Sequence, residues 1–103
     1  MYKVLLVDDE YMITEGLKRL IPFEKWDMEV VATTNHADDA LDYVREHPVD
    51  IVISDVNMPD KTGLEMIQEM KDLLTDAYYI LLSGYQEFDY VKKAMNLSVV
   101  DYL

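Results

Sequence analysis

Short apolar runs recur along the chain, separated by longer amphipathic segments. The runs are rich in Val, Ile and Tyr and do not alternate with polar residues, which is typical of parallel strands covered on both faces. They lie at residues 4–7, 29–34, 50–54, 78–83 and 98–103. The pattern therefore predicts five strands.

The segments between these runs carry apolar residues at helical spacing, which predicts one apolar stripe on each of four helices. The stripes consist of Ile13, Leu17, Leu20 and Ile21; Ala37, Ala40, Leu41 and Val44; Leu64, Ile67, Met70 and Leu74; and Phe88, Val91 and Met95. Pro22 is expected to end the first helix and Pro48 the second, because the residue before a proline avoids the helical region. Strands alternating with helices, joined by right-handed crossovers, predict an open, doubly wound parallel α/β sheet.

Three bulky or titratable residues are interpreted as structural. Trp26, in a rather long loop at residues 22–28, is expected to pack beneath that loop. His36 lies in a loop and His47 near a helix C-terminus, where a partial positive charge suits the helix dipole. None of the three is expected to act directly in function.

The composition is that of one globular domain. A chain of 103 residues that is 50% hydrophobic and 29% charged is long enough for one core and too short for two ordinary domains. Its formal charge of -12 argues against a nucleic-acid surface, since phosphate contacts need Lys and Arg. Any DNA binding is expected to come from elsewhere.

The sequence also predicts a location. The absence of cysteine excludes disulfides and thiolate metal sites and fits a reducing cytoplasm. We expect no signal peptide, because the N-terminus lacks a basic region, a long apolar run and a cleavage site. No apolar stretch approaches the roughly 20 residues that span a bilayer. We therefore expect a cytoplasmic protein without membrane contact.

Acidic residues follow two of the predicted strands. The stretch VLLVDDE at residues 4–10 ends in Asp8, Asp9 and Glu10, and Asp55 ends the third strand. Ligands of doubly wound sheets collect beyond the carboxyl ends of the strands, near the point where strand order reverses. We expect these carboxylates to converge there with Ser83, which ends the fourth strand.

Converging carboxylates require a proton or a cation, because each pair repels by roughly 4 kcal/mol at about 4 Å for an effective dielectric near 20. Oxygen ligands without His or Cys suit Mg²⁺, which also binds phosphoryl oxygens. For Asp8 and Asp9 alone, a solvated turn is the alternative. Asp55 favours a site, since it follows an apolar strand and precedes the loop VNMP, whose proline sets the backbone direction.

Four motifs together resemble the receiver domain of bacterial two-component response regulators, over the whole chain. They are DD at 8–9, SDVNMPDKTG at 54–63, LLSGY at 81–85 and VVDYL at 99–103. The resemblance implies a flavodoxin-like sheet with strand order 2-1-3-4-5. The stretches FEKWDMEVV and SGYQEFDYVKKAMNLSVVDYL further resemble receivers attached to AraC-type helix-turn-helix output domains.

The resemblance implies a signalling domain that assists its own phosphorylation and dephosphorylation. Asp55 would accept a phosphoryl group from a phosphohistidine of a sensor histidine kinase. Asp9 would bind Mg²⁺ directly and Asp8 largely through water, with Asp55 and the backbone carbonyl of Asn57 completing the metal ligands. Glu10 would be a flanking acid.

Two further positions match the family's switch residues. Ser83 would turn its hydroxyl toward the phosphoryl group, and the aromatic ring of Tyr102 would enter the space that it leaves. Without the resemblance, both residues would be assigned to the structure of the strands.

The chain departs from the family after the fifth strand. The family places an essential Lys there, followed by Pro and a final helix, whereas this sequence stops at Leu103, and Lys61, Lys92 and Lys93 do not substitute convincingly. We expect a C-terminally truncated receiver without its DNA-binding output domain. An apolar patch on one flank of the sheet and on the first helix would then be exposed and would favour a homodimer.

Other functions fit the residues less well. An FMN protein would need a Ser-, Thr- and Gly-rich phosphate loop after the first strand. An EF-hand pattern fails at Pro59 and Asp60. A Mg²⁺-dependent aspartyl phosphatase would have Asp in place of Glu10. A receiver that serves as a phosphorylation-independent interaction module is the main alternative, because the expected Lys is absent.

Overall fold

Five parallel strands form one sheet, in the order β2-β1-β3-β4-β5. The computed structural model describes residues 1–55, 62–74, 76–82 and 101–102. The strands are β1 (Tyr2–Val7), β2 (Met28–Thr34), β3 (Ile51–Asp55), β4 (Tyr78–Leu82) and β5 (Asp101–Tyr102). The predicted strand count and order are confirmed.

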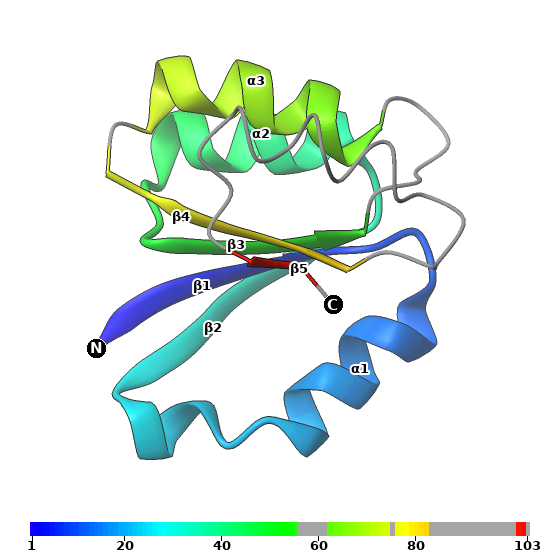
Figure 1. Cartoon of the computed structure of the whole chain (residues 1–103), viewed down its shortest axis with the longest axis vertical. Coiled ribbons are helices and arrows are strands. Elements are labelled where there is room, and N and C mark those ends of the chain that lie inside the picture. Colours follow the sequence, from blue (N-terminus) through cyan, green and yellow to red (C-terminus); the bar gives the residue numbers. More distant parts are fainter. Residues whose placement is uncertain (56–61, 75, 83–100, 103) are drawn as a thin grey trace.

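Helices cover both faces of this sheet. Helices α2 (Ala37–Glu46) and α3 (Gly63–Leu73) lie on one face, and α1 (Tyr11–Leu20) lies on the other (Figure 1). This is the predicted doubly wound arrangement. The predicted helix around Phe88 to Met95 lies outside the described residues, as do residues 98–100 of the last predicted strand. Among the described helices, none combines the length and the apolar character needed to cross a bilayer.

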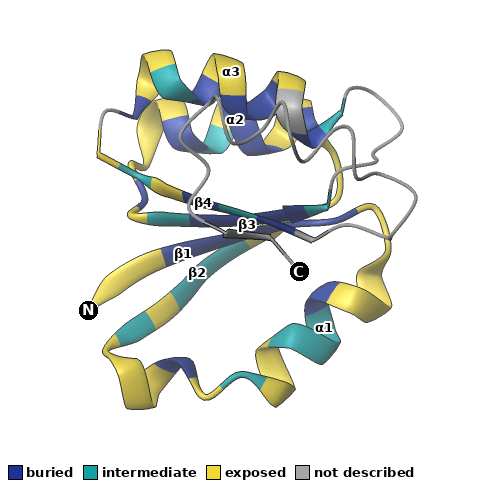
Figure 2. Ribbon diagram, viewed as in Figure 1, coloured by how far each residue is buried: buried dark blue, intermediate teal, exposed yellow. Residues whose placement is uncertain are grey.

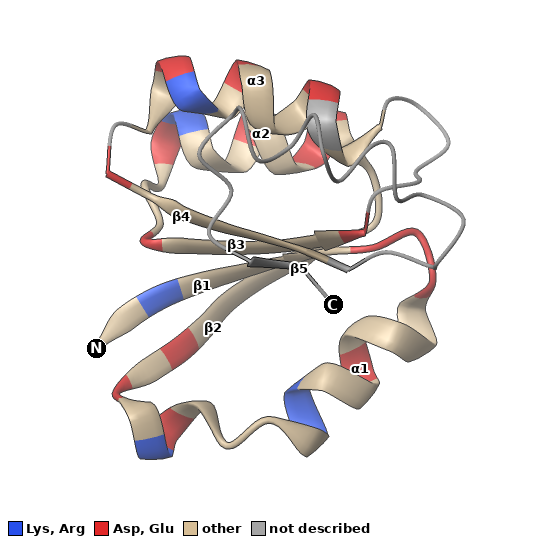
Figure 3. Ribbon diagram, viewed as in Figure 1, with Lys and Arg blue, Asp and Glu red and all other residues tan. Residues whose placement is uncertain are grey.

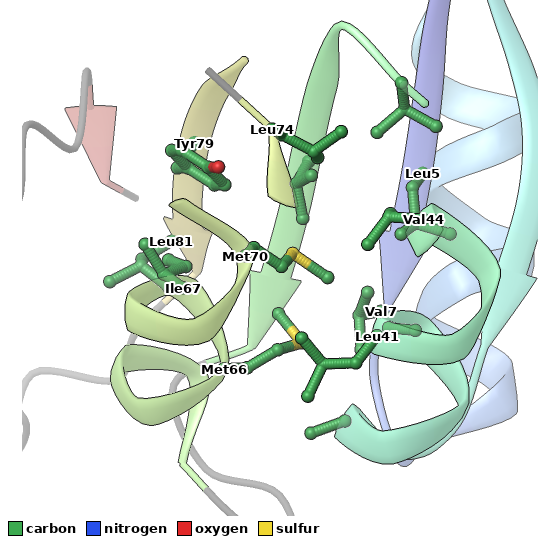
Figure 4. Close-up of a cluster of buried hydrophobic side chains, with 14 residues drawn as sticks. Leu5, Val7, Leu41, Val44, Met66, Ile67, Met70, Leu74, Tyr79 and Leu81 are labelled. Atoms are coloured by element: carbon green, nitrogen blue, oxygen red, sulfur yellow. The ribbon is translucent and has the colours of Figure 1, made fainter. Parts of the chain in front are cut away.

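Two apolar clusters follow from the alternation of side chains along the buried strands. Leu5 and Val7 of β1 belong to a large cluster with α2 and α3, whereas Val4 and Leu6 belong to a smaller one beneath α1. Figure 4 shows the large cluster, in which Met66, Ile67 and Met70 of α3 face the sheet. The central strands are buried along most of their length (Figure 2). The packed strands therefore fix the positions of the residues that follow their carboxyl ends.

The ends of the helices follow from local sequence. A capping box begins α3: the Thr62 hydroxyl accepts a hydrogen bond from the backbone N–H of Glu65, whose carboxylate accepts one from the backbone N–H of Thr62. Helix α1 ends at Leu20, two residues before Pro22, as predicted. A short 3₁₀ helix, η1 (Phe23–Trp26), then leads into β2, and Asp27 closes it with a positive φ of 59°.

One prediction about the α1 side of the molecule is wrong. The side chain of Trp26 is 56% exposed, because η1 turns Phe23 inward instead, which leaves Phe23 only 7% exposed. The predicted apolar stripe of α1 is partly buried, since Leu17 and Ile21 pack against the smaller cluster. Thr14 is buried, whereas Ile13 and Leu20 are exposed. The Thr14 hydroxyl can be buried because it donates a hydrogen bond to the carbonyl of Tyr11 within its own helix.

The α3 contact with the sheet should dominate stability. We expect Met70→Ala to lower the free energy of unfolding by about 2–4 kcal/mol, because Met70 is fully buried and its loss leaves a cavity. Leu73→Ala is the matched control, since Leu73 lies in the same helix and is 40% exposed. Urea denaturation followed by circular dichroism measures both. Equal losses in the two variants would contradict this account of the core.

Candidate functional site

Three carboxylates converge at the carboxyl edge of the sheet. Val7 is paired with Ser54 in the register of β1 and β3, so the next residues, Asp8 and Asp55, leave neighbouring strands at the same level. One oxygen from each of Asp8, Asp9 and Asp55 lies within 4.8 Å of the others. Figure 3 shows acidic residues after β1 and at the end of β3. The predicted convergence of these three residues is confirmed.

Backbone contacts hold Asp8 in place. Its side chain is buried, its backbone N–H donates to the carbonyl of Thr34 at 3.1 Å, and its Oδ1 accepts from the backbone N–H of Glu10 at 2.9 Å. Glu10 is the N-cap of α1, and its own side chain makes no capping bond. Strand β2 and the start of α1 thus both hold Asp8 in place, while the Glu10 side chain remains exposed.

This placement disfavours the ionised form of Asp8. Burial raises the pKa of its carboxyl from an ordinary 3.8 to about 6, the Glu10 N–H opposes that rise, and the charges of Asp55 and Asp9 add to it. A bound cation would reverse the balance, because it favours the ionised form of every carboxylate in the cluster. A cation at this place would therefore lower the cost of ionising Asp8.

Asp9 and Asp55 are more accessible than Asp8. Asp9 is exposed in the loop between β1 and α1, and Asp55 is half-buried at the last position of β3. Ser54, fully buried, donates its hydroxyl hydrogen to the carbonyl of Asp55 at 2.8 Å. The sequence motifs assign Ser54 no role of its own, although a polar residue at the end of an apolar strand is a signal for such a contact.

The other predicted site residues are only partly described. Asn57 and Ser83 lie outside the described residues. The backbone of Tyr102 is part of β5, where Tyr102 is paired with Leu81, but its side chain lies outside the description. The roles of these three residues stay predictions.

The donor set fits a hard divalent cation. All three side chains offer carboxylate oxygens, and no histidine belongs to the cluster found among the described residues. Such ligands suit Mg²⁺ or Ca²⁺ better than softer metals. One buried, one half-buried and one exposed carboxylate leave an open side for a further ligand.

Comparison with known proteins decides the family. A family model for the response regulator receiver domain matches residues 4–103. The chain belongs to this family. It is thus a receiver domain of a two-component response regulator, as the motifs in the sequence predicted.

Curated relatives of this receiver are longer proteins. An uncharacterised response regulatory protein of Staphylococcus epidermidis is 40% identical over 103 residues, covering 100% of this chain and 40% of that protein. The transcriptional regulatory protein HptR of Staphylococcus aureus is 36% identical with the same coverage. The chain therefore spans 40% of the length of these relatives.

Solved structures agree with the fold of this receiver. The REC domain of AraT, a response regulator from Geobacillus stearothermophilus, matches with a TM-score of 0.93 and 37% identity, covering 99% of this chain and 79% of that one. A two-component transcriptional regulator AraC from Clostridium phytofermentans matches with a TM-score of 0.92 and 26% identity, covering 100% and 80%. The predicted likeness to receivers of AraC-type regulators is confirmed.

Removing the buried charge should stabilise the metal-free receiver. Because the pKa of Asp8 is higher folded than unfolded, the folded state binds more protons between about pH 4 and pH 6, and stability falls as the pH rises through that window. We expect Asp8→Asn to raise the free energy of unfolding by about 1–3 kcal/mol at pH 7.5 in EDTA. The upper limit follows from linkage, because each unit of pKa difference between the folded and unfolded states corresponds to about 1.4 kcal/mol.

Denaturation at a series of pH values measures this gain, which should shrink toward pH 4. Asp72→Asn, at an exposed position of α3, removes the same charge without a buried carboxylate and serves as the control. A gain in Asp8→Asn that does not depend on pH would contradict the electrostatic explanation.

Proposed function

We propose that this receiver is a phosphoacceptor switch in which Asp55 takes a phosphoryl group from a sensor histidine kinase in a Mg²⁺-dependent reaction. The observation that carries the proposal is the convergence of Asp8, Asp9 and Asp55 within 4.8 Å at the carboxyl edge of the sheet. Family membership supports the same assignment. No other cluster of metal-ligating side chains is found among the described residues.

Asp55 is the proposed nucleophile because of its position. It ends a buried strand, its carbonyl is held by Ser54, and its side chain is half-buried rather than enclosed. A carboxylate oxygen of Asp55 forms a bond to phosphorus, while the bond between phosphorus and the donor's histidine nitrogen breaks. The bonding electron pair returns to the imidazole, which takes up a proton. The product is an aspartyl phosphate.

Asp8 and Asp9 are the proposed metal carboxylates, with Asp55 and the backbone of Asn57 as further ligands. Their oxygens match the preference of Mg²⁺, and a positive neighbour would offset the burial and the nearby charges that raise the pKa of Asp8. When bound, Mg²⁺ supplies positive charge that neutralises phosphoryl oxygens. Asp8 provides the rigid ligand, since two backbone contacts orient it, and exposed Asp9 faces solvent.

The phosphoryl group would act on the rest of the protein through a switch. It adds about two negative charges at the edge of the sheet, toward which Ser83 would turn its hydroxyl. Tyr102 would then move its ring, and the change would reach a DNA-binding output domain beyond this receiver. We propose that the whole protein is cytoplasmic, regulates transcription and forms a homodimer through receiver surfaces, while the receiver itself binds neither DNA nor membrane.

A phosphorylation-independent interaction module is the second candidate function. Such a module would have no need for three carboxylates that repel one another beside a buried strand end. The acidic cluster therefore favours phosphorylation.

Intact-mass spectrometry tests the proposal directly. After incubation with Mg²⁺ and a small phosphodonor such as phosphoramidate, we expect the gain of one phosphoryl group, and none with EDTA or in Asp55→Asn. Asp50→Asn is the matched control, because Asp50 is an exposed aspartate that precedes β3 at the opposite end of the same strand. It should be phosphorylated like the parent protein.

A version extended through the expected Lys and Pro accompanies this experiment. Phosphorylation of the extended chain alone would confirm the function and assign the difference to the added residues. A folded, extended chain that gains no phosphoryl group would contradict the proposal and favour the interaction module.

A further inference from the structure

Ser54 carries a hydroxyl at a position whose surroundings are apolar. The residue is completely buried, and the strand register pairs it with Val7 of β1 and Leu81 of β4. Both neighbours belong to the large apolar cluster beneath α2 and α3. An aliphatic side chain would fit these surroundings without the cost of taking a hydroxyl out of water. The hydroxyl is therefore a feature that packing alone does not require.

The hydrogen bond of this hydroxyl connects Ser54 to the proposed phosphoacceptor. The hydroxyl donates to the backbone carbonyl of Asp55 at 2.8 Å. Within the described structure, the buried side-chain oxygens that lack a partner are those of Thr34 and Tyr79, and Ser54 is not among them. The bond joins two consecutive residues, so it neither caps a helix nor links two strands. What it fixes is the peptide group that follows Asp55.

The bond holds this carbonyl on one side of β3. Side chains alternate between the two faces of a strand. Ser54 therefore lies on the α2–α3 side together with Val52, which belongs to the large cluster. Asp55 lies on the opposite side together with Ile53, which belongs to the smaller cluster. The carbonyl oxygen of Asp55 is thus drawn toward Ser54 and away from the face that carries the Asp55 carboxylate.

Asp55 stands where the sheet gives its backbone less support. The β1–β3 ladder ends at the pair of Val7 and Ser54. The β3–β4 ladder continues for one more pair, Asp55 and Leu82. The Ser54 hydroxyl acts at this last position, on the backbone torsion ψ of Asp55, which sets the direction of its carbonyl. Because the rotamers open to a side chain depend on φ and ψ, a fixed carbonyl also restricts the Asp55 carboxylate.

We propose that Ser54 is a positioning residue for the phosphoacceptor. Its hydroxyl fixes ψ of Asp55 and thereby keeps the carboxylate in the one rotamer that places it beside Asp8 and Asp9. The inference rests on the proposed function of Asp55, and it adds a residue that acts on the nucleophile without touching the phosphoryl donor. A carboxylate with several rotamers would face the donor for only part of the time, which slows phosphoryl transfer.

Nuclear magnetic resonance measures this rotamer directly, without metal or phosphodonor. The couplings between Hα and Hβ of Asp55 report the populations of its χ1 rotamers. We expect the couplings of a single rotamer in the parent protein and averaged couplings in Ser54→Ala. Ser54→Thr keeps the hydroxyl and should restore the parent couplings. The chemical shift of the Asp55 carbonyl carbon, recorded on the same samples, reports whether the hydrogen bond is present.

Phosphorylation gives the functional readout. The rate constant with Mg²⁺ and phosphoramidate, followed by intact-mass spectrometry, should fall about tenfold in Ser54→Ala and return to within about threefold of the parent in Ser54→Thr.

Thr14→Val is the matched control for both measurements. Thr14 is also buried, and its hydroxyl also donates to a backbone carbonyl, that of Tyr11 in helix α1, at 2.9 Å. The variant should leave the Asp55 couplings unchanged and the rate constant within about twofold of the parent, because the two hydroxyls share no partner.

A single Asp55 rotamer together with the parent rate in Ser54→Ala would overturn the proposal. So would a folded Ser54→Thr that does not restore the couplings, because the effect of Ser54→Ala would then come from packing. Equal losses in Thr14→Val would show a general effect of a missing buried hydroxyl. If Ser54→Thr does not fold, the carbonyl shift decides, since an unchanged shift in Ser54→Ala refutes the hydrogen bond. A parent chain that is not phosphorylated would contradict the proposed function, while the couplings still decide whether Ser54 orients Asp55.

Discussion

The burial of one carboxylate beside two others, at the end of packed strands, is the constraint on which the rest of this receiver depends. One oxygen from each of Asp8, Asp9 and Asp55 lies within 4.8 Å of the others, and Asp8 is almost completely buried. Burial raises the pKa of Asp8, the neighbouring charges add to the rise, and the strands keep the three carboxylates close together. The apolar residues of β1 and β3 hold these strands in place, since they are packed between helices on both faces of the sheet. The core is therefore part of the site's chemistry.

The same constraint links stability to binding. A carboxylate that is costly to ionise in the metal-free protein becomes a strong ligand once a cation is present, because binding removes the cost. The backbone contacts of Asp8 to Thr34 and Glu10 hold the ligand in one orientation while this exchange takes place. Ser54 acts similarly on the backbone of Asp55. The cost of ionising Asp8 in the metal-free state and its readiness for a cation thus have one cause.

The two ends of the sheet differ in character. Carboxylates gather where the strands end, whereas apolar residues, cations and carboxylates together line a groove where β2 begins. The α1 side is also less completely covered than the α2–α3 side, as the exposure of Ile13 and Leu20 shows. Apolar surface left open on one side of a small domain is suited to partners.

The sequence by itself determined the strands, because uninterrupted apolar runs are local signals. The order of the strands followed from the family motifs. The convergence of Asp8, Asp9 and Asp55 followed from the position of these acids at strand ends. The burial of Thr14 and Phe23 in place of Ile13, Leu20 and Trp26 could not be predicted from the chain. Which face of α1 turns inward depends on how η1 and β2 pack against it, and a hydroxyl can be buried once its own helix accepts its hydrogen bond. The raised pKa of Asp8 and the groove between α1, η1 and β2 were likewise decided only by the tertiary structure, since burial and cavities arise where distant segments meet.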